Sequence, residues 1–277
     1  MENGIYYSIS HRDYHAMTER MSNTYLGRLE ECPAAGKVPI EETQAMTFGR
    51  ALHLYALEGE TYFNQNVVVT PKIDMRTKVG QQIKLEMDLL RQNDPDKCFI
   101  NQDEFEDIKA IAYSISIHPW ASQLIGNGVN EISVLWTDKD FCIDCKARPD
   151  MLPSKEKRAL IDLKKTRSAD LYDFQRAIVT YGYYRQAAFY LDGMSEITGE
   201  EWDIFALIAV EDKAPYRVEV YTLSKDFITY GRQEYKRLLS IEKQCKSVNI
   251  WPNYKYDEVT MIDIPQYLYY RYPGEAV

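Results

Sequence analysis

Residues 148–164 read RPDMLPSKEKRALIDLK, and this stretch decides the fold that the sequence predicts. Apolar-rich runs of strand length lie on either side of a charged turn that begins at Pro153, which is the pattern of a β-hairpin. If the turn centres near residues 155–157, Asp150 and Asp162 face each other across the two strands. Side chains in such pairs stand about 4.5 to 5.5 Å apart. Both carboxylates are therefore expected to reach one ion.

The residues around the second aspartate add to this expectation. Strand side chains alternate between faces, so Asp162 and Lys164 share one face while Leu163 points into the core. This leaves the backbone carbonyl of Leu163 as a further oxygen ligand. Two ionised carboxylates this close repel each other, so the bare site should hold an extra proton or bind a cation. Mg²⁺, with Mn²⁺ as a substitute, suits oxygen ligands, and Lys164 would orient or help deprotonate a water aimed at phosphorus. The predicted reaction is phosphodiester hydrolysis.

Pro149-Asp150 and Asp162-Leu163-Lys164 together resemble the signature of the PD-(D/E)xK nucleases. The wider chain, over about residues 5–225, resembles the RecE-type (exonuclease VIII) branch found in phages and prophages. Three further segments match that branch in the same order, namely GRALHLYALEG at 49–59, NEISVLW at 130–136 and YRQAAFYLDG at 184–193. A lone D-x-K would be weak evidence, whereas four motifs in the right order are specific.

The resemblance implies a role for each matched side chain. It assigns catalytic roles to Lys164, Asp150, Asp162, Glu131, Gln186 and Tyr190, and metal ligation to His53, Asp150, Asp162 and the Leu163 carbonyl. Taken one at a time, these residues also have ordinary structural explanations. His53 lies in an apolar helical run where an isolated histidine often belongs to the core, Glu131 could flank a strand, and Gln186 could pack as a helix residue. The order of the motifs links them, so they stand or fall together.

The resemblance also implies an activity. It indicates a magnesium-dependent exonuclease that degrades one strand of double-stranded DNA from an end, 5′ to 3′, and leaves a 3′ single-stranded tail. Such a product suits a single-strand annealing protein of the RecT-like kind as partner, in DNA recombination. Relatives form closed rings, so a homo-oligomeric trimer or tetramer is expected, encoded by a phage or prophage in a bacterial host. An endonuclease of the same fold, or a catalytically silent protein that binds DNA ends, stays open as an alternative.

The net charge of −9 looks unsuited to DNA, because phosphate contacts come from lysine and arginine. Basic residues nevertheless follow the proposed catalytic strand and gather in an earlier segment at 72–84, so a basic groove within an acidic exterior is expected. The candidates for DNA contact are Arg50, Arg76, Lys78, Lys165, Arg167 and Arg185. Any one of them could equally belong to an ordinary solvated helix face.

With 277 residues and 45% hydrophobic content, the chain can bury one large core, and we expect a single domain over residues 1–277. Its parts would be a helical and basic-loop region at about 1–95, a catalytic core at about 96–223, and a C-terminal helix with an aromatic tail at about 224–277. The sequence contains no apolar run of 18 residues and no signal-peptide pattern. A cytoplasmic protein that does not enter the membrane is therefore expected.

Cysteines and tyrosines have other possible roles. Five cysteines, an odd number, do not indicate a disulfide framework. Cys142 and Cys145 are spaced as in zinc or iron–sulfur sites, but positions three apart on a strand point to opposite faces, so packing as small apolar groups is favoured. The chain has 22 tyrosines, many of them in the tail, where a subunit interface is favoured over base stacking.

The remaining pattern predicts the order of the elements. Helices are expected at residues 11–29, 44–58, 79–92, 102–117, 170–193 and 224–247, and strands at 67–71, 130–137, 140–151, 158–165, 201–211 and 216–223. From residue 102 onward this is the αβββαβ order of the PD-(D/E)xK core, an α/β fold with a central mixed sheet, here preceded by helical elements. No glycine-rich phosphate loop appears, which disfavours a doubly wound nucleotide-binding sheet.

Overall fold

The structure, a computed structural model, describes residues 1–126, 128–153, 158–254 and 259–269. At its centre lies a five-stranded mixed sheet in the order β10-β9-β8-β7-β4. Its strands are β4 (Gly128–Asn130), β7 (Met151–Pro153), β8 (Ala159–Thr166), β9 (Ile204–Glu211) and β10 (Val218–Thr222). β8 pairs with β9 in parallel, whereas the β7–β8 and β9–β10 pairs are antiparallel. The predicted α/β class with a central mixed sheet is confirmed.

Two smaller sheets flank the central one. The first has the order β1-β5-β6 and contains β1 (Gly4–Tyr6), β5 (Ser133–Asp138) and β6 (Ile143–Ala147), all antiparallel. The second joins β2 (Val67–Thr70) to β3 (Cys98–Asn101) in parallel. Glu131 lies just before β5, and Asp150 lies between β6 and β7.

Most helices begin at a polar side chain that accepts a backbone N–H, such as Ser22, Thr43 and Ser224. Asn101 and Glu104 form the predicted capping box at the start of α7. The helices are α1 (His11–Ala16), α2 (Asn23–Glu31), α3 (Pro33–Lys37), α4 (Gln44–His53) with a π-helical extension η1 (Leu54–Glu58), α5 (Glu60–Asn66), α6 (Lys78–Asn93), α7 (Gln102–Ile117), α8 (Pro119–Ile125), α9 (Leu171–Thr180), α10 (Tyr183–Thr198), α11 (Lys225–Val248) and α12 (Gln266–Tyr269).

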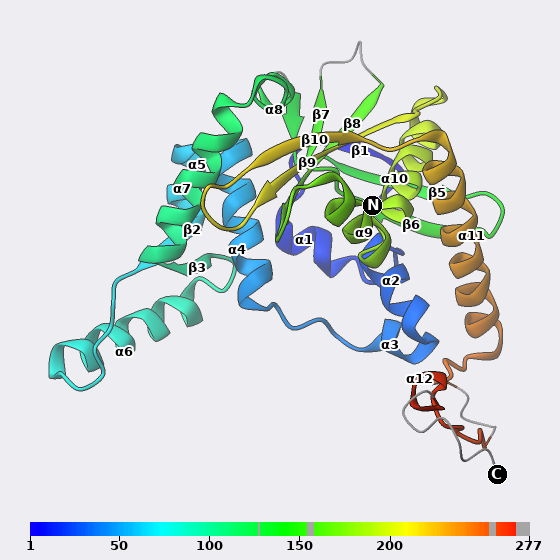
Figure 1. Ribbon diagram of the computed structural model, residues 1–277, viewed down its shortest axis with the longest axis horizontal. Coiled ribbons are helices and arrows are strands. Elements are labelled where there is room, and N and C mark those ends of the chain that lie inside the picture. The colour runs from blue at the N-terminus through cyan, green and yellow to red at the C-terminus, as the bar shows by residue number, and fades with distance from the viewer. Residues whose placement is uncertain (127, 154–157, 255–258, 270–277) are drawn as a thin grey trace.

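Helices cover both faces of the central sheet, which explains why β8 and β9 are apolar along most of their length. Leu160 and Leu207 pack on one face in a core shared with α10 and α11. Ile161 and Leu163 pack on the other face in a core shared with α4 and α7. Figure 1 shows α10 and α11 on one side of the sheet and α4 and α7 on the other. The alternation leaves Asp162 and Lys164 on the α10 side.

The predicted helix 11–29 is wrong as a single element. α1 ends at Ala16, and the following residues run beside β6 instead of continuing the helix. Met21 forms a parallel bridge with Cys145, and its N–H donates to the Asp144 carbonyl at 2.8 Å. Ser22 then caps α2. The contact with β6 outweighs the helical preference of this segment.

Two other predictions are wrong in the same way. The predicted strand 140–151 is divided between two sheets, because β6 ends at Ala147, β7 begins at Met151, and Pro149, which has no N–H for a ladder, lies between them. The predicted helix 170–193 is divided into α9 and α10. The break falls at Tyr181 and Gly182, where Gly182 has a φ of 66°. The predicted strand 130–137 also begins only at Ser133.

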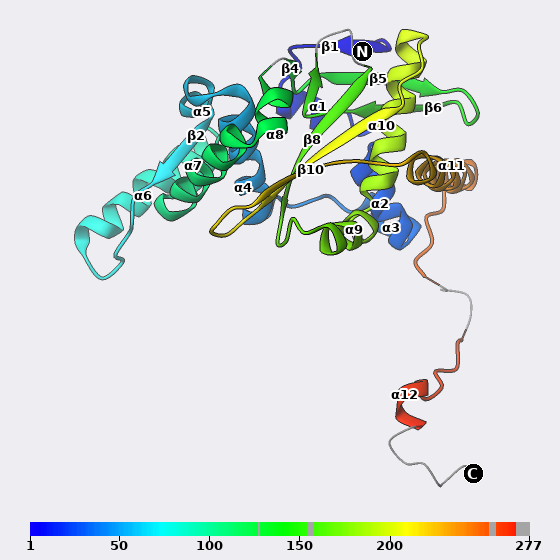
Figure 2. The ribbon, with the colours of Figure 1, turned by 45° about the horizontal axis from the view of Figure 1, so that its top comes forward.

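Two segments extend from the body of the protein, namely the arm formed by α6 with its preceding loop, and the C-terminal tail with α12 (Figures 1 and 2). Both segments lie in the regions that the sequence predicts to be outside the catalytic core. Within the described residues, no helix combines the length and the apolar character that a membrane crossing requires.

The close crossing of α10 and α11 generates a first prediction. A Cβ at Gly231 would lie 2.1 Å from the Tyr184 carbonyl oxygen, so Gly231→Ala must push the helices apart and should destabilise the protein by about 1 to 3 kcal/mol. Gly49→Ala is the matched control, because a Cβ there meets nothing within 4 Å and a helical alanine should be neutral or stabilising by up to about 1 kcal/mol. Urea unfolding measures both. Equal midpoints for Gly231→Ala and the parent would show that the helices do not cross this closely.

Candidate active site

The pairing of β7 with β8 brings the two aspartates together. Met151 pairs with Ile161 in an antiparallel register, and one step further this register sets Asp150 opposite Asp162. Asp150 lies in the bend just before β7, and its Oδ2 accepts the backbone N–H of Leu163 at 2.7 Å. The predicted centre of the turn lies outside the described residues. The carboxylate of Asp150 is therefore fixed against the edge of β8 by a hydrogen bond to the strand itself.

His53 reaches the same place from the end of α4. Its Nε2 lies 3.1 Å from the Leu163 carbonyl oxygen. Its Nδ1 lies 3.5 Å from Asp150 Oδ1 and 3.7 Å from Glu131 Oε1. His53, Glu131 and Asp150 each offer one ligand atom, and these atoms all lie within 4.8 Å of one another. We call these three residues the His53 cluster.

Glu131 is held by an unusual backbone. It lies between β4 and β5 with a φ of 51°, a left-handed conformation that is uncommon outside glycine. Its N–H donates to the Asp150 carbonyl at 2.9 Å. This bond ties the two acidic residues together and directs the Glu131 side chain toward His53. Non-glycine residues in this region often lie at functional sites, where the surroundings hold the strained conformation.

Asp162 and Lys164 stand beside the cluster and form a pair of their own. Asp162 is 1% exposed, and its Oδ1 accepts a hydrogen bond from Gln186 Nε2 at 2.7 Å. Asp162 Oδ2 is buried and forms an ion pair with Lys164 Nζ at 2.5 Å. The structure thus brings the predicted ligands together in part, with Asp162 paired to Lys164 at the edge of the His53 cluster.

The electrostatics of this group favour extra positive charge. Burial and the charge of Asp162 raise the pKa of Asp150 to about 7, against the opposing effect of His53 and Lys164. Burial lowers the pKa of His53, but the charges of Asp150 and Glu131 outweigh it and bring that pKa to about 9. Burial likewise opposes protonation of Lys164, yet Asp162 and Asp150 raise its pKa to about 12. Without a cation, the site keeps protons at neutral pH.

A divalent cation fits these residues. The carboxylates of Glu131 and Asp150 converge there with the His53 imidazole, and the Leu163 carbonyl oxygen lies 3.1 Å from His53 Nε2. Oxygen ligands with one imidazole are a donor set that divalent cations accept. A cation would take the position of the protons that His53 and Asp150 otherwise hold, because metal ligands must be deprotonated. Lys164, kept as an ammonium group by its neighbours, can donate hydrogen bonds to a water molecule or to a phosphate oxygen.

Tyr190, the last of the predicted catalytic residues, lies behind Gln186 rather than at the cluster. It is buried, and its ring meets Phe205 edge to face with centroids 6.3 Å apart. Burial raises the pKa of Tyr190 well above its usual value, and the charges of Tyr14 and Asp162 add to this. The hydroxyl therefore stays protonated, and it can exchange a hydrogen bond with Gln186, the partner of Asp162. The catalytic role of Tyr190 stays a prediction.

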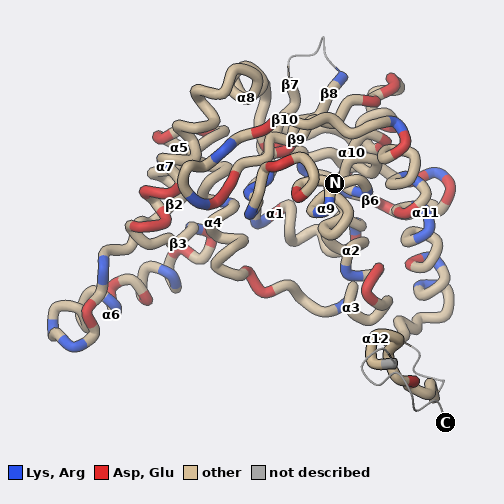
Figure 3. Tube along the Cα trace, viewed as in Figure 1, with Lys and Arg blue, Asp and Glu red and all other residues tan. Residues whose placement is uncertain are grey.

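The six predicted DNA contacts are dispersed. Arg185 is buried, forms an ion pair with Glu30 and donates to Asn23 Oδ1, so it is committed to the interior. Arg50 donates to Cys98 Sγ and lies 3.6 Å from Glu42. Lys165 lies 3.4 Å from Asp212, and Arg167 is exposed just beyond β8. Figure 3 shows the basic segment that contains Arg76 and Lys78 at the outer end of the α6 arm. These residues do not form one continuous basic groove.

Sequence reasoning missed one residue at the site. The ring centroid of Tyr183 lies 4.7 Å from Lys164 Nζ, within the range of a cation–π contact. Tyr183 precedes Gln186 by three residues on α10, so both side chains belong to the helix face that looks toward β8. Once Gln186 had been placed, helical spacing would have identified Tyr183 as its neighbour.

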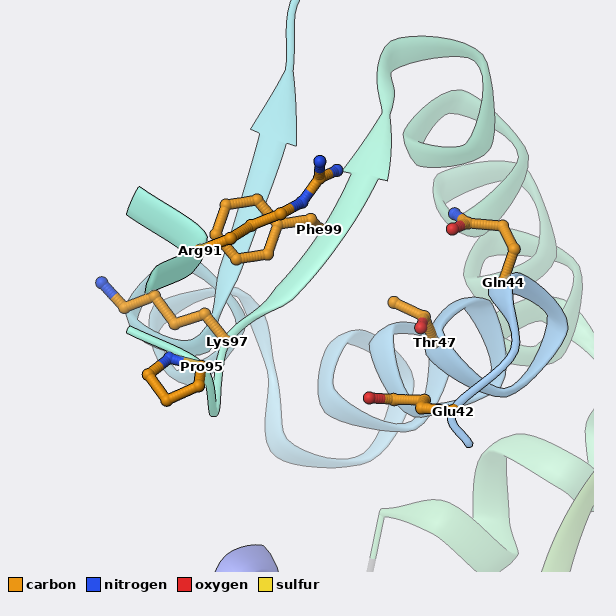
Figure 4. Close-up of a pocket in the computed structure, with 7 residues that line it drawn as sticks. All are labelled: Glu42, Gln44, Thr47, Arg91, Pro95, Lys97 and Phe99. Atoms are coloured by element: carbon orange, nitrogen blue, oxygen red, sulfur yellow. The ribbon is translucent and has the colours of Figure 1, made fainter. Parts of the chain in front are cut away.

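A cavity of about 340 Å³ lies at the opposite end of α4 from His53 (Figure 4). Arg91 and Lys97 face Glu42 and Thr47 across it. Glu42 lies 3.6 Å from Arg50, and Lys97 pairs with Asp94 at 3.3 Å, so both charges already have partners. No residue of the His53 cluster lines this cavity, so the chemistry belongs to the cluster and not to the cavity.

Comparisons with known proteins bear on the family and the fold. The family model described as "PDDEXK-like domain of unknown function (DUF3799)" matches residues 21–260. A solved structure from Eubacterium rectale, described as "Putative exonuclease", superimposes with a TM-score of 0.61 at 14% identity, covering 97% of this chain and 99% of that chain. The structure of SSO0001 reaches a TM-score of only 0.30 at 15% identity, over 80% of this chain and 90% of that chain, and supports no conclusion. No curated protein matches. The fold is that of the PD-(D/E)xK nucleases.

The raised pKa of Asp150 generates a second prediction. A carboxyl whose folded pKa lies above its unfolded value costs stability as pH rises from about 4 through about 7, and the cost is complete above that. Asp150→Asn removes this cost and can still accept the Leu163 N–H. In EDTA at pH 8 the variant should therefore be more stable than the parent by at least about 1 kcal/mol, measured by thermal unfolding.

A control and a second condition complete this test. Asp103→Asn changes an exposed carboxylate in the first turn of α7 that pairs with exposed Lys72. It removes a favourable charge at a helix N-terminus, so its unfolding midpoint should not rise above that of the parent. Added divalent cation should raise the midpoint of the parent far more than that of Asp150→Asn. If Asp150→Asn unfolds below the parent in EDTA, the carboxylates are not in repulsive proximity.

Proposed function

Because the chain belongs to the family of PDDEXK-like domains of unknown function (DUF3799), we propose that it is a metal-dependent nuclease that hydrolyses phosphodiester bonds of DNA. The observation that carries this proposal is the meeting of the His53 cluster with the Asp162–Lys164 pair. Three groups able to hold a metal converge within 4.8 Å, and a lysine ammonium stands beside them. A structural ion pair needs only two partners, whereas this group gathers three acids, a histidine and a lysine.

The chain's own residues would divide the work as follows. Asp150, Glu131 and His53 hold a divalent cation, which supplies positive charge against the charge that builds on the phosphate. Lys164 donates a hydrogen bond that orients the attacking water. Gln186 fixes the Asp162 carboxylate, and thereby the position of Lys164. The water oxygen bonds to phosphorus and loses a proton, the bond from phosphorus to one bridging oxygen breaks, and that oxygen gains a proton, so one water is consumed.

We propose Mg²⁺ as the natural cation, with Mn²⁺ able to replace it. Carboxylate and carbonyl oxygens suit Mg²⁺, while the single imidazole is a donor that Mn²⁺ accepts at least as readily. Phosphate oxygens of the substrate would complete the coordination in either case. The mixed donor set thus supports both ions.

The exonuclease form of the activity is the next part of the proposal. It rests on the resemblance to the RecE-type branch and agrees with the description of the Eubacterium rectale protein as "Putative exonuclease". Digestion would run 5′ to 3′ from a duplex end and leave a 3′ tail for a single-strand annealing protein. Such an enzyme would act in recombination.

Assembly into a ring of three or four copies belongs to the same proposal. Val259, Met261 and Ile262 in the C-terminal tail are almost fully exposed, although such side chains are normally covered. A neighbouring copy of the chain would bury them. The exposed apolar side chains thus support the predicted interface role of the tail. They do not fix the number of subunits.

Lysine 164 provides the direct test of the mechanism. Lys164→Ala should lower the rate of digestion of linear duplex DNA in Mg²⁺ by at least about 100-fold, because it removes the group that orients the nucleophile and offsets phosphate charge. Lys139→Ala is the matched control, since Lys139 is exposed and forms its ion pair with Glu196, away from the His53 cluster. Release of labelled nucleotides measures the rate. Equal digestion by Lys164→Ala and the parent would end the proposed mechanism.

The form of the DNA tests the exonuclease assignment. The parent protein should digest linear duplex and leave covalently closed circular duplex intact, because a closed circle presents no end. Agarose electrophoresis of both substrates in one reaction measures this. Nicked or linearised circles at a rate comparable with linear digestion would make the protein an endonuclease of the same fold.

A further inference from the structure

The turn between α9 and α10 interrupts what the sequence predicts to be one helix. α9 ends at Thr180, α10 begins at Tyr183, and the two residues between them make a sharp corner. The Tyr181 N–H still bonds to Ala177, and the Gly182 carbonyl already accepts the N–H groups of Arg185 and Gln186. One helix thus stops and the next starts without a linker. We call residues 181–183 the tyrosine turn.

The tyrosine turn is held in place from inside the protein. Gly182 has a φ of 66°, and a Cβ at this position would lie 2.8 Å from Arg185 Nη2. The Arg185 guanidinium is buried, pairs with Glu30 on α2 and donates to Asn23 Oδ1 at 3.2 Å. Arg185 is therefore a fixed support under the turn, and its role is to position the two tyrosines on either side of Gly182.

The turn directs one aromatic ring to the active site and the other to solvent. Tyr183 lies against the Lys164 ammonium at 4.7 Å, and its ring is 5.7 Å from the ring of Tyr181, with an interplanar angle of 32°. Tyr181 is 64% exposed. The two rings form a row that runs from the catalytic lysine to the surface. Figure 2 shows α9 beyond the end of β8.

We propose that Tyr181 and Tyr183 form a stacking platform for a nucleobase next to the scissile phosphate. The inference rests on the proposed function, because Lys164 marks the place of that phosphate. A base is joined to its phosphate through one sugar. Lys164 Nζ lies 4.7 Å from the ring centroid of Tyr183, and the ring of Tyr181 lies 5.7 Å further along the row. Every base has a π-face, so the platform accepts any sequence. At a duplex end the outer face of the last base is uncovered, so the ligand is the terminal nucleotide of a duplex.

The chemistry of the two rings separates their roles. Tyr183 is half-buried and contacts Lys164, so it is a positioning residue for the ammonium group as well as the inner part of the platform. Tyr181 makes its ring contact with Tyr183 and keeps most of its surface free. The rival explanation is a subunit contact, because exposed Val179 lies close by on α9. The test must distinguish a base from a protein partner.

The experiment uses duplexes that carry 2-aminopurine at either the 5′ or the 3′ terminal nucleotide and phosphorothioate linkages that resist cleavage. The parent in Mg²⁺ should quench the fluorescence of one of these labels on binding, because the base stacks on tyrosine. Tyr181→Phe should keep the quenching. Tyr181→Ala should lose it and bind the duplex end roughly 5- to 100-fold more weakly. Tyr113→Ala is the matched control, since Tyr113 on α7 is 66% exposed, and it should behave like the parent.

Three outcomes would overturn the platform. If Tyr181→Ala keeps the quenching and binds within twofold of a parent that digests linear DNA, the platform is wrong and the nuclease proposal stands. If Tyr181→Ala changes the sedimentation coefficient of the free protein while quenching is retained, the tyrosine turn is a subunit contact. If the parent neither binds nor cuts linear DNA, the proposed function fails and the platform fails with it.

Discussion

The hydrogen bond from the Leu163 N–H to Asp150 Oδ2 is the interaction on which the site depends. The N–H and C=O of one strand residue point toward the same edge of the strand, so both polar groups of Leu163 face the side from which β7 approaches. β7 begins only at Met151 and supplies no backbone partner there. The Asp150 carboxylate accepts a hydrogen bond from the Leu163 N–H, and His53 Nε2 lies within hydrogen-bond distance of the Leu163 carbonyl oxygen. Two predicted metal ligands are thus placed by the unmet hydrogen bonds of a single residue.

This arrangement concentrates negative charge in a place that water reaches poorly, and the rest of the fold must hold it there. Leu160 and Ile161 anchor β8 in the cores on opposite faces of the sheet, so the strand cannot turn to relieve the repulsion. The left-handed backbone of Glu131 and the hydrogen bond from Gln186 to Asp162 also hold these acidic side chains in place. Apolar packing on both faces offsets the electrostatic cost. A bound cation would remove that cost, which links ligand binding to the stability of the sheet.

The sequence predicted what local pattern controls. The hairpin register that faces Asp150 with Asp162, the cap at Asn101 and the apolar β8 and β9 all follow from short-range rules, and the structure has them. The breaks at residues 17–22 and at Gly182 depend on partners far away in sequence, namely Cys145 and Glu30. For the same reason Arg185 looked like a DNA contact, because its sequence neighbourhood does not reveal the acid that buries it. The left-handed backbone of Glu131 also leaves no local signature.

The dispersal of basic residues changes how DNA can be attracted to this protein. A chain with a net charge of −9 repels phosphate at long range, and Lys165 and Arg50 are partly neutralised by their own acidic neighbours. Lys164 is also balanced by Asp162. A cation held by the His53 cluster would add positive charge at the site, so DNA and cation would each strengthen the binding of the other. Stacking on exposed aromatic rings is the other source of affinity open to such a surface, because it does not depend on charge. Under the proposed function, this acidic protein would hold DNA best where the cation is already in place.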